Sequence, residues 1–145
     1  MVSDNYFLDT NIFLRSMVGA DARKTTECDK LLSVIRDGSI NALTSSVVLA
    51  EIVWTGRSYY NIEKNDLIEA PRGIITMPYL KFDERVDMQL ALEYFGRHAI
   101  KFVDALIASS FSLQVGNAKL VSYDRDFDKL GVVRVEPAEV VKKLK

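Results

Sequence analysis

Short apolar runs alternate with longer segments that carry an apolar residue at every third or fourth position. The short runs are rich in β-branched and aromatic residues and predict strands, whereas the longer amphipathic segments predict helices. We expect strands at Asn5–Asp9, Ile40–Leu43, Tyr79–Phe82, Lys119–Tyr123 and Val132–Val135. We expect helices at Ile12–Met17, Asp21–Asp37, Val47–Tyr60, Asn61–Met77, Asp83–Gly96 and Lys101–Leu113.

Polar residues and helix breakers sharpen several of these boundaries. Asp21 and Asp83 predict N-caps, because an aspartate side chain accepts hydrogen bonds from the first free N–H groups of a helix. Gly96 predicts the end of the helix that Asp83 begins. Pro71 and Gly73 predict that the segment around them is bent or broken. The residues after the last strand are expected to form a short basic tail.

Strands that alternate with helices predict an α/β fold of three layers, with helices on both faces of a short, mostly parallel sheet. The sequence contains no internal repeat, no low-complexity segment and no Pro/Gly/Ser linker, so we expect one domain over residues 1–145. In such sheets ligands bind beyond the carboxyl ends of the strands. Polar residues at those ends are therefore the first candidates for a functional site.

Composition and charge narrow the setting of the protein. The formal net charge is -1, which disfavours a simple nucleic-acid coating protein but not a nuclease, whose active site is itself acidic. Cys28 is the only cysteine, so no disulfide can form within the chain, and a reducing cytoplasmic setting is expected. No run approaches the ~20 apolar residues of a membrane span, and no signal peptide is evident.

Four carboxylates occur where apolar neighbours predict contact with the core. Glu51 and Asp104 lie inside apolar helical segments, while Asp9 and Asp124 directly follow predicted strands. A carboxylate that faces the core costs several kcal/mol unless it is paired or binds a cation. Four acids in one cleft would also repel one another and raise each other's pKa. A bound divalent cation would remove both penalties.

The available donors indicate which cation would bind. Carboxylates are hard oxygen ligands, which suit Mg²⁺ or Mn²⁺. His98 is the only histidine, and no cysteine or histidine pair has the spacing of a zinc site. Such an ion polarises a phosphodiester and lowers the pKa of a bound water for in-line attack.

Each acid also has an explanation that involves no function. Asp9 could cap a helix, Glu51 could pair with a buried arginine, and Asp104 could complement a helix dipole. Asp124 and Asp126 could simply belong to a solvated turn. It is the joint placement of the acids, at strand ends and on inward helix faces, that favours a site.

The segments around these acids carry a family resemblance that covers nearly the whole chain in the right order. They resemble the four motifs of PIN-domain ribonucleases, especially the VapC-type toxins of toxin–antitoxin pairs. The matching segments are Phe7–Leu14, Ser45–Ser46 with Glu51–Trp54, Phe102–Ala108 and Val121–Phe127. Ser122 departs mildly from the pattern, since the family often has threonine there, and the hydroxyl is kept.

The resemblance implies a compact α/β/α domain, Mg²⁺- or Mn²⁺-dependent cleavage of RNA and frequent homodimers. It also implies a cognate VapB-type antitoxin that occludes the acidic pocket. Carried over to this chain, it gives Asp9, Glu51, Asp104 and Asp124 as the catalytic acids. Three of them, Asp9, Asp104 and Asp124, are expected to bind the metal, and Glu51 to orient or deprotonate a water molecule.

Further residues are expected to support the acids or to hold the substrate. Asn11 and Ser122 match small polar positions that hydrogen-bond the carboxylates, and Asp126 supports them or shapes the loop. RNA that approaches an acidic pocket needs basic residues beside it. Arg15, one helical turn beyond Asn11, is our first candidate, ahead of Lys101 and other nearby basic residues.

Two other classes of protein are compatible with parts of this pattern. A non-catalytic PIN-like nucleic-acid-binding or scaffold module would keep the fold, although such a module usually loses at least one acid. A receiver domain or a haloacid-dehalogenase-type phosphatase also places acids at strand ends. The phosphatases need a second aspartate where this chain has Asn11, and receivers need paired acids where Asp9 stands alone.

Overall fold

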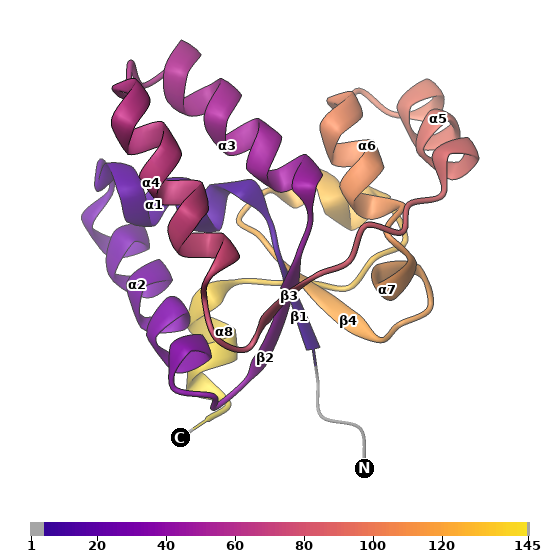
Figure 1. The fold of residues 1–145 in the computed structure, drawn as a ribbon. Coiled ribbons are helices and arrows are strands. Elements are labelled where there is room, and N and C mark those ends of the chain that lie inside the picture. Colours follow the sequence, from indigo (N-terminus) through magenta and orange to yellow (C-terminus); the bar gives the residue numbers. More distant parts are fainter. Residues whose placement is uncertain (1–4, 145) are drawn as a thin grey trace.

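The computed structural model describes residues 5–144, which form a central sheet between two layers of helices (Figure 1). In this part of the chain five strands, all parallel, pair in the order β3-β2-β1-β4-β5. The strands are β1 (Asn5–Leu8), β2 (Asn41–Thr44), β3 (Leu80–Phe82), β4 (Ala118–Val121) and β5 (Arg134–Val135). The expected α/β/α architecture is confirmed, and the sheet is parallel throughout.

The helices divide between the two faces of the sheet. They are α1 (Thr10–Val18), α2 (Ala22–Arg36), α3 (Ser46–Ser58), α4 (Lys64–Ile75), α5 (Met88–Arg97), α6 (Phe102–Ala108), α7 (Phe111–Gln114) and α8 (Pro137–Lys142). Figure 1 shows α1, α2, α4 and α8 on one side and α5, α6 and α7 on the other. Helix α3 contacts α1 and α4 on the first side and α6 on the second, so it links the layers at one end of the sheet.

Strand β1 lies at the centre of the sheet and defines the edge at which polar residues gather. Its Phe7 and Leu8 are fully buried, as expected for a strand covered on both faces. The backbone continues the ladder for one more residue, since the Asp9 N–H donates to the Val121 carbonyl at 3.1 Å. The carboxyl ends of β1, β2 and β4 therefore meet at one edge, where α1 and α3 begin.

Of the two alternatives predicted for the segment around Pro71 and Gly73, a bent or a broken helix, helix α4 excludes the broken one. It runs without interruption from Lys64 to Ile75, with Pro71 inside it. A proline in a helix removes one N–H donor and crowds the preceding turn. Leu67 and Ile74 are buried on either side of Pro71, and this apolar face holds the helix against the core.

The prediction that Asp83 caps a helix is wrong. Asp83 follows β3 and is buried there, with its carboxylate 2.9 Å from the Arg85 guanidinium. The cap of α5 is Asp87, whose side chain accepts from the Leu90 N–H. Gly96 does not end this helix, which continues to Arg97. Two aspartates four residues apart offered equivalent caps, and pairing of the first with arginine decided between them.

Two other boundaries also differ from the sequence-based expectation. The helix expected at Lys101–Leu113 is divided into α6 and α7 at Ser109 and Ser110, both fully buried. Part of the expected tail after the last strand, Pro137–Lys142, forms helix α8. Glu136 and Glu139 make a reciprocal capping box at the start of that helix, and Glu136 is not one of the residues usually preferred as an N-cap.

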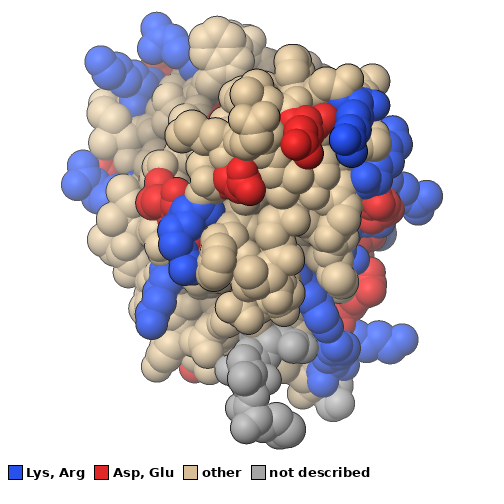
Figure 2. Space-filling model, turned by 90° about the vertical axis from the view of Figure 1, so that its right-hand side faces the viewer, with Lys and Arg blue, Asp and Glu red and all other residues tan. Residues whose placement is uncertain are grey.

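The face formed by α5, α6 and α7 is rich in exposed apolar side chains. Figure 2 shows this side of the molecule, on which uncharged surface predominates, several acidic residues lie in the upper part and most basic residues lie towards the margins. The exposed apolar residues of these helices are Met88, Leu92, Phe95, Phe102 and Phe111. No helix within residues 5–144 combines the length and the apolar character that a bilayer crossing requires.

Candidate metal centre

Three of the four predicted acids meet at the edge where β1 ends. Asp9, Glu51 and Asp104 each offer a carboxylate oxygen, and the three oxygens lie within 4.8 Å of one another. Asp9 is 3% exposed and Asp104 is 4% exposed, so two of the three acids are withdrawn from bulk solvent. We call these three residues the acidic triad.

Local structure explains why each acid of the triad points to this place. Asp9 is the N-cap of α1, and its Oδ1 accepts from the Thr10 N–H at 2.8 Å. Glu51 precedes the buried Ile52 in α3, which crosses the sheet edge between the two helical layers. Asp104 lies in the first turn of α6, next to a fully buried alanine. The capping role proposed for Asp9 is therefore real, but it does not account for the other two acids.

Electrostatics in the triad favour the protonated form of two acids in the metal-free protein. Burial, with a further contribution from the charge of Glu51, raises the pKa of Asp9 to about 6 despite hydrogen bonds from Ser122 and Thr10. Burial and the nearby charge of Asp9 raise the pKa of Asp104 to about 7. Both pKa values lie well above the ordinary value of 3.8. The folded protein therefore disfavours the charged forms of Asp9 and Asp104 when no cation is bound.

Asp9 is held in place by a network that includes Asn11 and Ser122, two of the three predicted supporting residues. Its Oδ2 accepts from the Ser122 hydroxyl at 2.7 Å and from the Asn11 amide at 3.3 Å. The Ser122 Oγ in turn accepts from Asn11 at 3.2 Å and from the Asp124 N–H at 3.0 Å. The fully buried hydroxyl of Ser122 thus joins β1, α1 and the loop after β4.

Asp124, the fourth predicted acid, lies beside the triad but is not part of it. Its charge contributes to the raised pKa values of Asp9 and Asp104, after burial and the other contributions. Its Oδ1 accepts from the Asp126 N–H at 2.9 Å, which caps the 3-10 helix η1 (Arg125–Lys129). The Asp126 carboxylate points away to an ion pair with Lys129 at 3.5 Å.

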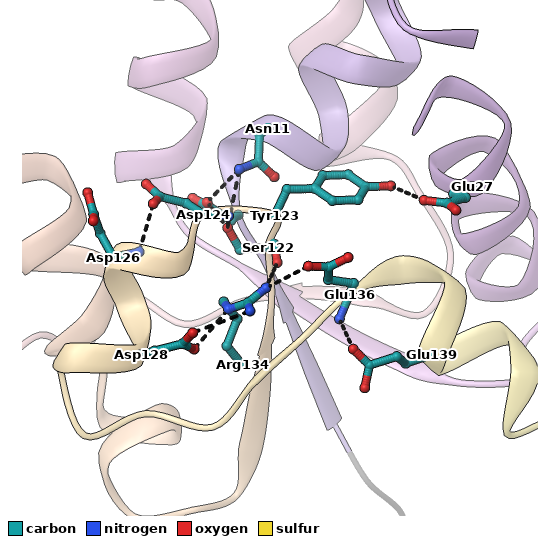
Figure 3. A network of polar contacts seen from close by, with 11 residues as sticks. Asn11, Glu27, Ser122, Tyr123, Asp124, Asp126, Asp128, Arg134, Glu136 and Glu139 are labelled. Carbon is teal, nitrogen blue, oxygen red and sulfur yellow. Dashed lines mark hydrogen bonds and ion pairs between the residues drawn. The ribbon is translucent and has the colours of Figure 1, made fainter. Parts of the chain in front are cut away.

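An arginine that sequence reasoning missed anchors this loop from below (Figure 3). The Arg134 guanidinium donates to the Ser122 carbonyl at 2.9 Å. It also binds Asp128 through two nitrogens and Glu136 through one, at 2.9 to 3.3 Å. The Arg134 side chain is 12% exposed, whereas its partners Asp128 and Glu136 are 53% and 32% exposed. The only sequence signal was an arginine within the last apolar run.

A tyrosine anchors the same loop from the other side. The Tyr123 hydroxyl donates to Glu27 at 2.8 Å, as Figure 3 shows, and accepts from the Cys28 thiol at 3.7 Å. The Lys24 ammonium lies 4.9 Å from the centre of the tyrosine ring. Tyr123 thereby ties the loop to α2, while its neighbours Ser122 and Asp124 face the acids.

The basic residues differ in their relation to the triad. Arg15 lies in α1, and its charge contributes, after a hydrogen bond from the Lys24 backbone, to a lowered pKa of Asp21 at the start of α2. Within residues 5–144 no hydrogen bond or ion pair joins Arg15 to the triad. Lys101 does reach it, since its Nζ lies 3.4 Å from Glu51 Oε2.

The residues at this edge fit a divalent cation. Three carboxylates converge, and two buried oxygens next to Asp9, Thr10 Oγ1 and Asn11 Oδ1, have no hydrogen-bond partner. All of these donors are oxygens, the ligand type that Mg²⁺ and Mn²⁺ prefer. A bound cation would offset the repulsion that raises the pKa values of Asp9 and Asp104.

Comparisons with known proteins agree with the architecture. A family model described as PIN domain matches residues 6–133. Among solved structures, Mycobacterium tuberculosis VapC20, described as a Sarcin-Ricin loop cleaving toxin, matches with TM-score 0.68 and 22% identity over 91% of this chain and 99% of that chain. A comparison with curated protein sequences finds no match.

Two further structures show the same fold at lower identity. VapBC2 from Rickettsia felis, bound to a DNA fragment from its promoter, matches with TM-score 0.59 and 19% identity over 91% of this chain and 98% of that chain. PAE2754 from Pyrobaculum aerophilum matches with TM-score 0.61 and 14% identity over 98% of this chain and 97% of that chain. At such identities the likeness concerns the fold.

Proposed function

Because the chain belongs to the PIN domain family, we propose that it is a ribonuclease that depends on Mg²⁺ or Mn²⁺ and acts as the toxin of a VapBC-type pair. The observation that carries this proposal is the acidic triad, whose three carboxylate oxygens lie within 4.8 Å of one another. The fold likeness to VapC20 and VapBC2 supports the toxin assignment. We further propose that residues 1–145 act as a single domain and that it works in the cytoplasm.

Each acid has a distinct part in the proposed mechanism. Asp9 and Asp104 would hold the metal, Asp124 is our third candidate ligand, and Asn11 and Ser122 fix the orientation of Asp9. When bound, the cation supplies Lewis-acid activation of the phosphodiester and lowers the pKa of a water molecule. Glu51, which is intermediate in burial, would orient the attacking water and accept its proton. Asp126 acts only through the loop, because its carboxylate faces Lys129.

RNA would reach this site across a rim that carries few basic groups close to the acids. Lys101 and Arg125 are exposed beside the triad and the loop, and they are better placed than Arg15 to meet phosphates. Arg15 remains a candidate for contacts further along the strand. Lys101→Met, Arg125→Met and Arg15→Met should raise the KM for RNA in proportion to the part that each residue has in binding phosphates. An unchanged KM in all three variants would show that none of these residues attracts the substrate.

We also propose a protein partner for the apolar groove between α1 and α4. The groove has a volume of about 590 Å³ at one end, lined by Met17, Tyr60 and Ile62 with acidic residues Asp66 and Glu69 at its edge. An apolar and basic peptide segment, as an antitoxin of the VapB type could provide, complements such a surface. If Glu69→Lys binds a co-expressed antitoxin as tightly as the parent does, the partner lies elsewhere.

The exposed apolar face of α5, α6 and α7 is our candidate for a homodimer contact (Figure 2). Contiguous exposed apolar surface of this kind marks interaction sites in folded proteins. Light scattering after size-exclusion chromatography should give the mass of two chains, and Phe95→Glu should give the mass of one. A monomeric parent protein would contradict the dimer.

The decisive experiment separates a metal-dependent nuclease from a non-catalytic module with the same fold. Asp104→Asn should lower Mn²⁺ affinity, measured by calorimetry, and reduce RNA cleavage by at least about a thousandfold, because it removes a buried ligand. Asp66→Asn, at an exposed site on α4, is the matched control and should change neither. A parent protein with no saturable Mn²⁺ site would favour the binding or scaffold module, and full cleavage by Asp104→Asn would refute the site.

A further inference from the structure

Lys101 stands in a special position relative to the acidic triad. It is the N-cap residue of α6, three positions before Asp104, and its ammonium lies 3.4 Å from Glu51 Oε2. Among the described residues it is the one basic side chain that forms an ion pair with an acid of the triad. The triad therefore already has one cation of the protein's own at its rim.

The charge of Lys101 acts on all three acids and not only on Glu51. Partial burial lowers the pKa of Lys101, but the charges of Glu51, Asp104 and Asp9 outweigh this effect and raise it overall. The charge of Lys101 also acts on Asp104. It lowers the pKa of Asp104, although the larger effect of burial raises that pKa overall. Lys101 thus partly compensates the triad when no metal is present.

The exposure of Lys101 allows its ion pair with Glu51 to be broken when another cation binds. The Lys101 side chain is 70% exposed, whereas Glu51 is 9% exposed, so the ammonium can swing into solvent while the carboxylate stays. An exposed ion pair with a single contact is a weak interaction. A divalent cation carries twice the charge and can touch several carboxylates at once.

We propose that Lys101 is a displaceable internal counter-ion of the acidic triad, which stabilises the metal-free protein and weakens the binding of the divalent cation. This inference rests on the proposed function, since it assumes that the triad binds a metal. Two like charges near one site repel, so the ammonium beside Glu51 opposes the binding of a metal ion by the neighbouring Asp9 and Asp104. Lys101 then sets the metal concentration at which the site fills.

The proposal predicts effects of opposite sign for one substitution. Lys101→Met keeps much of the length of the side chain and removes its charge. The metal-free protein should lose compensation of the triad and melt at a lower temperature. The Mn²⁺ complex should form more tightly, because the competing cation is gone. A lysine that only stabilised the fold would lower the melting temperature and leave metal affinity unchanged.

The experiment compares Lys101→Met, Lys101→Arg and Lys129→Met in the full chain. Lys129 is the matched control, because it forms an ion pair of similar length, 3.5 Å, with Asp126 and is 55% exposed. The Mn²⁺ dissociation constant is measured by calorimetry at about pH 8.5, where protons compete little with the metal for groups of these pKa values. Melting temperatures are measured in excess chelator.

We expect Lys101→Met to bind Mn²⁺ roughly tenfold more tightly and to melt about 2–4 °C lower without metal. Lys101→Arg should stay close to the parent, and Lys129→Met should leave Mn²⁺ affinity unchanged. Equal or weaker Mn²⁺ binding by Lys101→Met would overturn the inference. A parent that binds no Mn²⁺ would overturn both this inference and the proposed function, whereas a parent that binds Mn²⁺ without cutting RNA would refute only the ribonuclease.

Discussion

Two groups of carboxylates lie on opposite sides of Ser122, and they differ in how far a basic residue compensates their charge. On one side Asp128 and Glu136 share the guanidinium of Arg134, which also donates to the Ser122 carbonyl. On the other side the Ser122 hydroxyl donates to Asp9 of the acidic triad, whose nearest cation is the exposed Lys101. One residue thus contacts a compensated and a largely uncompensated group of acids.

The difference shows which acids serve the fold and which do not. The hydrogen bond from Arg134 lowers the pKa of Asp128, so the folded state favours the charged form of that acid. Burial raises the pKa values of Asp9 and Asp104, so the folded state disfavours their charged forms. Acids that weaken the fold unless a cation is supplied are typical of functional sites.

The largest expected effect concerns the pH dependence of the metal-free protein. Asp9 with a pKa of about 6 and Asp104 with a pKa of about 7 keep protons that the unfolded chain, with values near 3.8, releases. The free energy of unfolding should therefore fall as pH rises from about 4 to about 7, and then level off. Asp104→Asn cannot ionise and should be more stable than the parent by roughly 3 kcal/mol at about pH 8.

Urea unfolding followed by circular dichroism, in excess chelator, would measure this difference. At about pH 2.5 the two proteins should unfold at nearly the same urea concentration, because Asp104 is then protonated in both the folded and the unfolded parent. Asp66→Asn controls for the loss of an exposed charge. If the stability difference between Asp104→Asn and the parent is the same at both pH values, the charged form of Asp104 does not destabilise the fold.

Removing the compensating arginine should have the next largest effect, and of opposite sign. Arg134→Met leaves Asp128 and Glu136 without their partner and removes a donor from the Ser122 carbonyl, so stability should fall by about 2 kcal/mol. Arg72→Met breaks an exposed pair with Glu69 and should cost less than about 0.5 kcal/mol. Equal losses in the two variants, measured by chemical unfolding, would remove the distinction between them.

The smallest expected effect tests the residue that joins the two groups. Ser122→Ala removes the hydroxyl that orients Asp9 and should weaken Mn²⁺ binding roughly tenfold, as calorimetry would show. Ser122→Thr keeps the hydroxyl and should restore most of the affinity. Ser110→Ala, which removes a buried hydroxyl that has no partner, should leave Mn²⁺ affinity as it is. Unchanged binding by Ser122→Ala would show that Asp9 needs no orienting group.

Sequence reasoning could predict those features whose cause is local. Asp9, Glu51 and Asp104 were identifiable because each interrupts or follows an apolar run, and a charge there is costly. The stripe of α2 was equally clear, since Cys28 and Leu31 repeat with helical spacing and both are fully buried. A periodic pattern is visible in the chain itself and needs no knowledge of distant partners.

Features that depend on distant partners could not be predicted in this way. Asp83 and Asp87 look alike as caps, and only the ion pair of Asp83 with Arg85 decides which one begins α5. The role of Arg134 requires knowing that β5 runs beside β4, which brings its guanidinium to the Ser122 carbonyl. The contact between Lys101 and Glu51, 50 positions apart, depends in the same way on the packing of α3 against α6.

The central place of β1 has a consequence for how the protein is made. Its two neighbours, β2 and β4, come from opposite halves of the chain, and Asp9 meets Ser122 across 113 positions. A ribosome therefore releases the first acid long before the strand that steadies it has left the exit tunnel. On the proposed function, a nascent polypeptide that stops short of β4 lacks a finished centre, so an enzyme able to harm its own host stays harmless until β4 and Ser122 have been made.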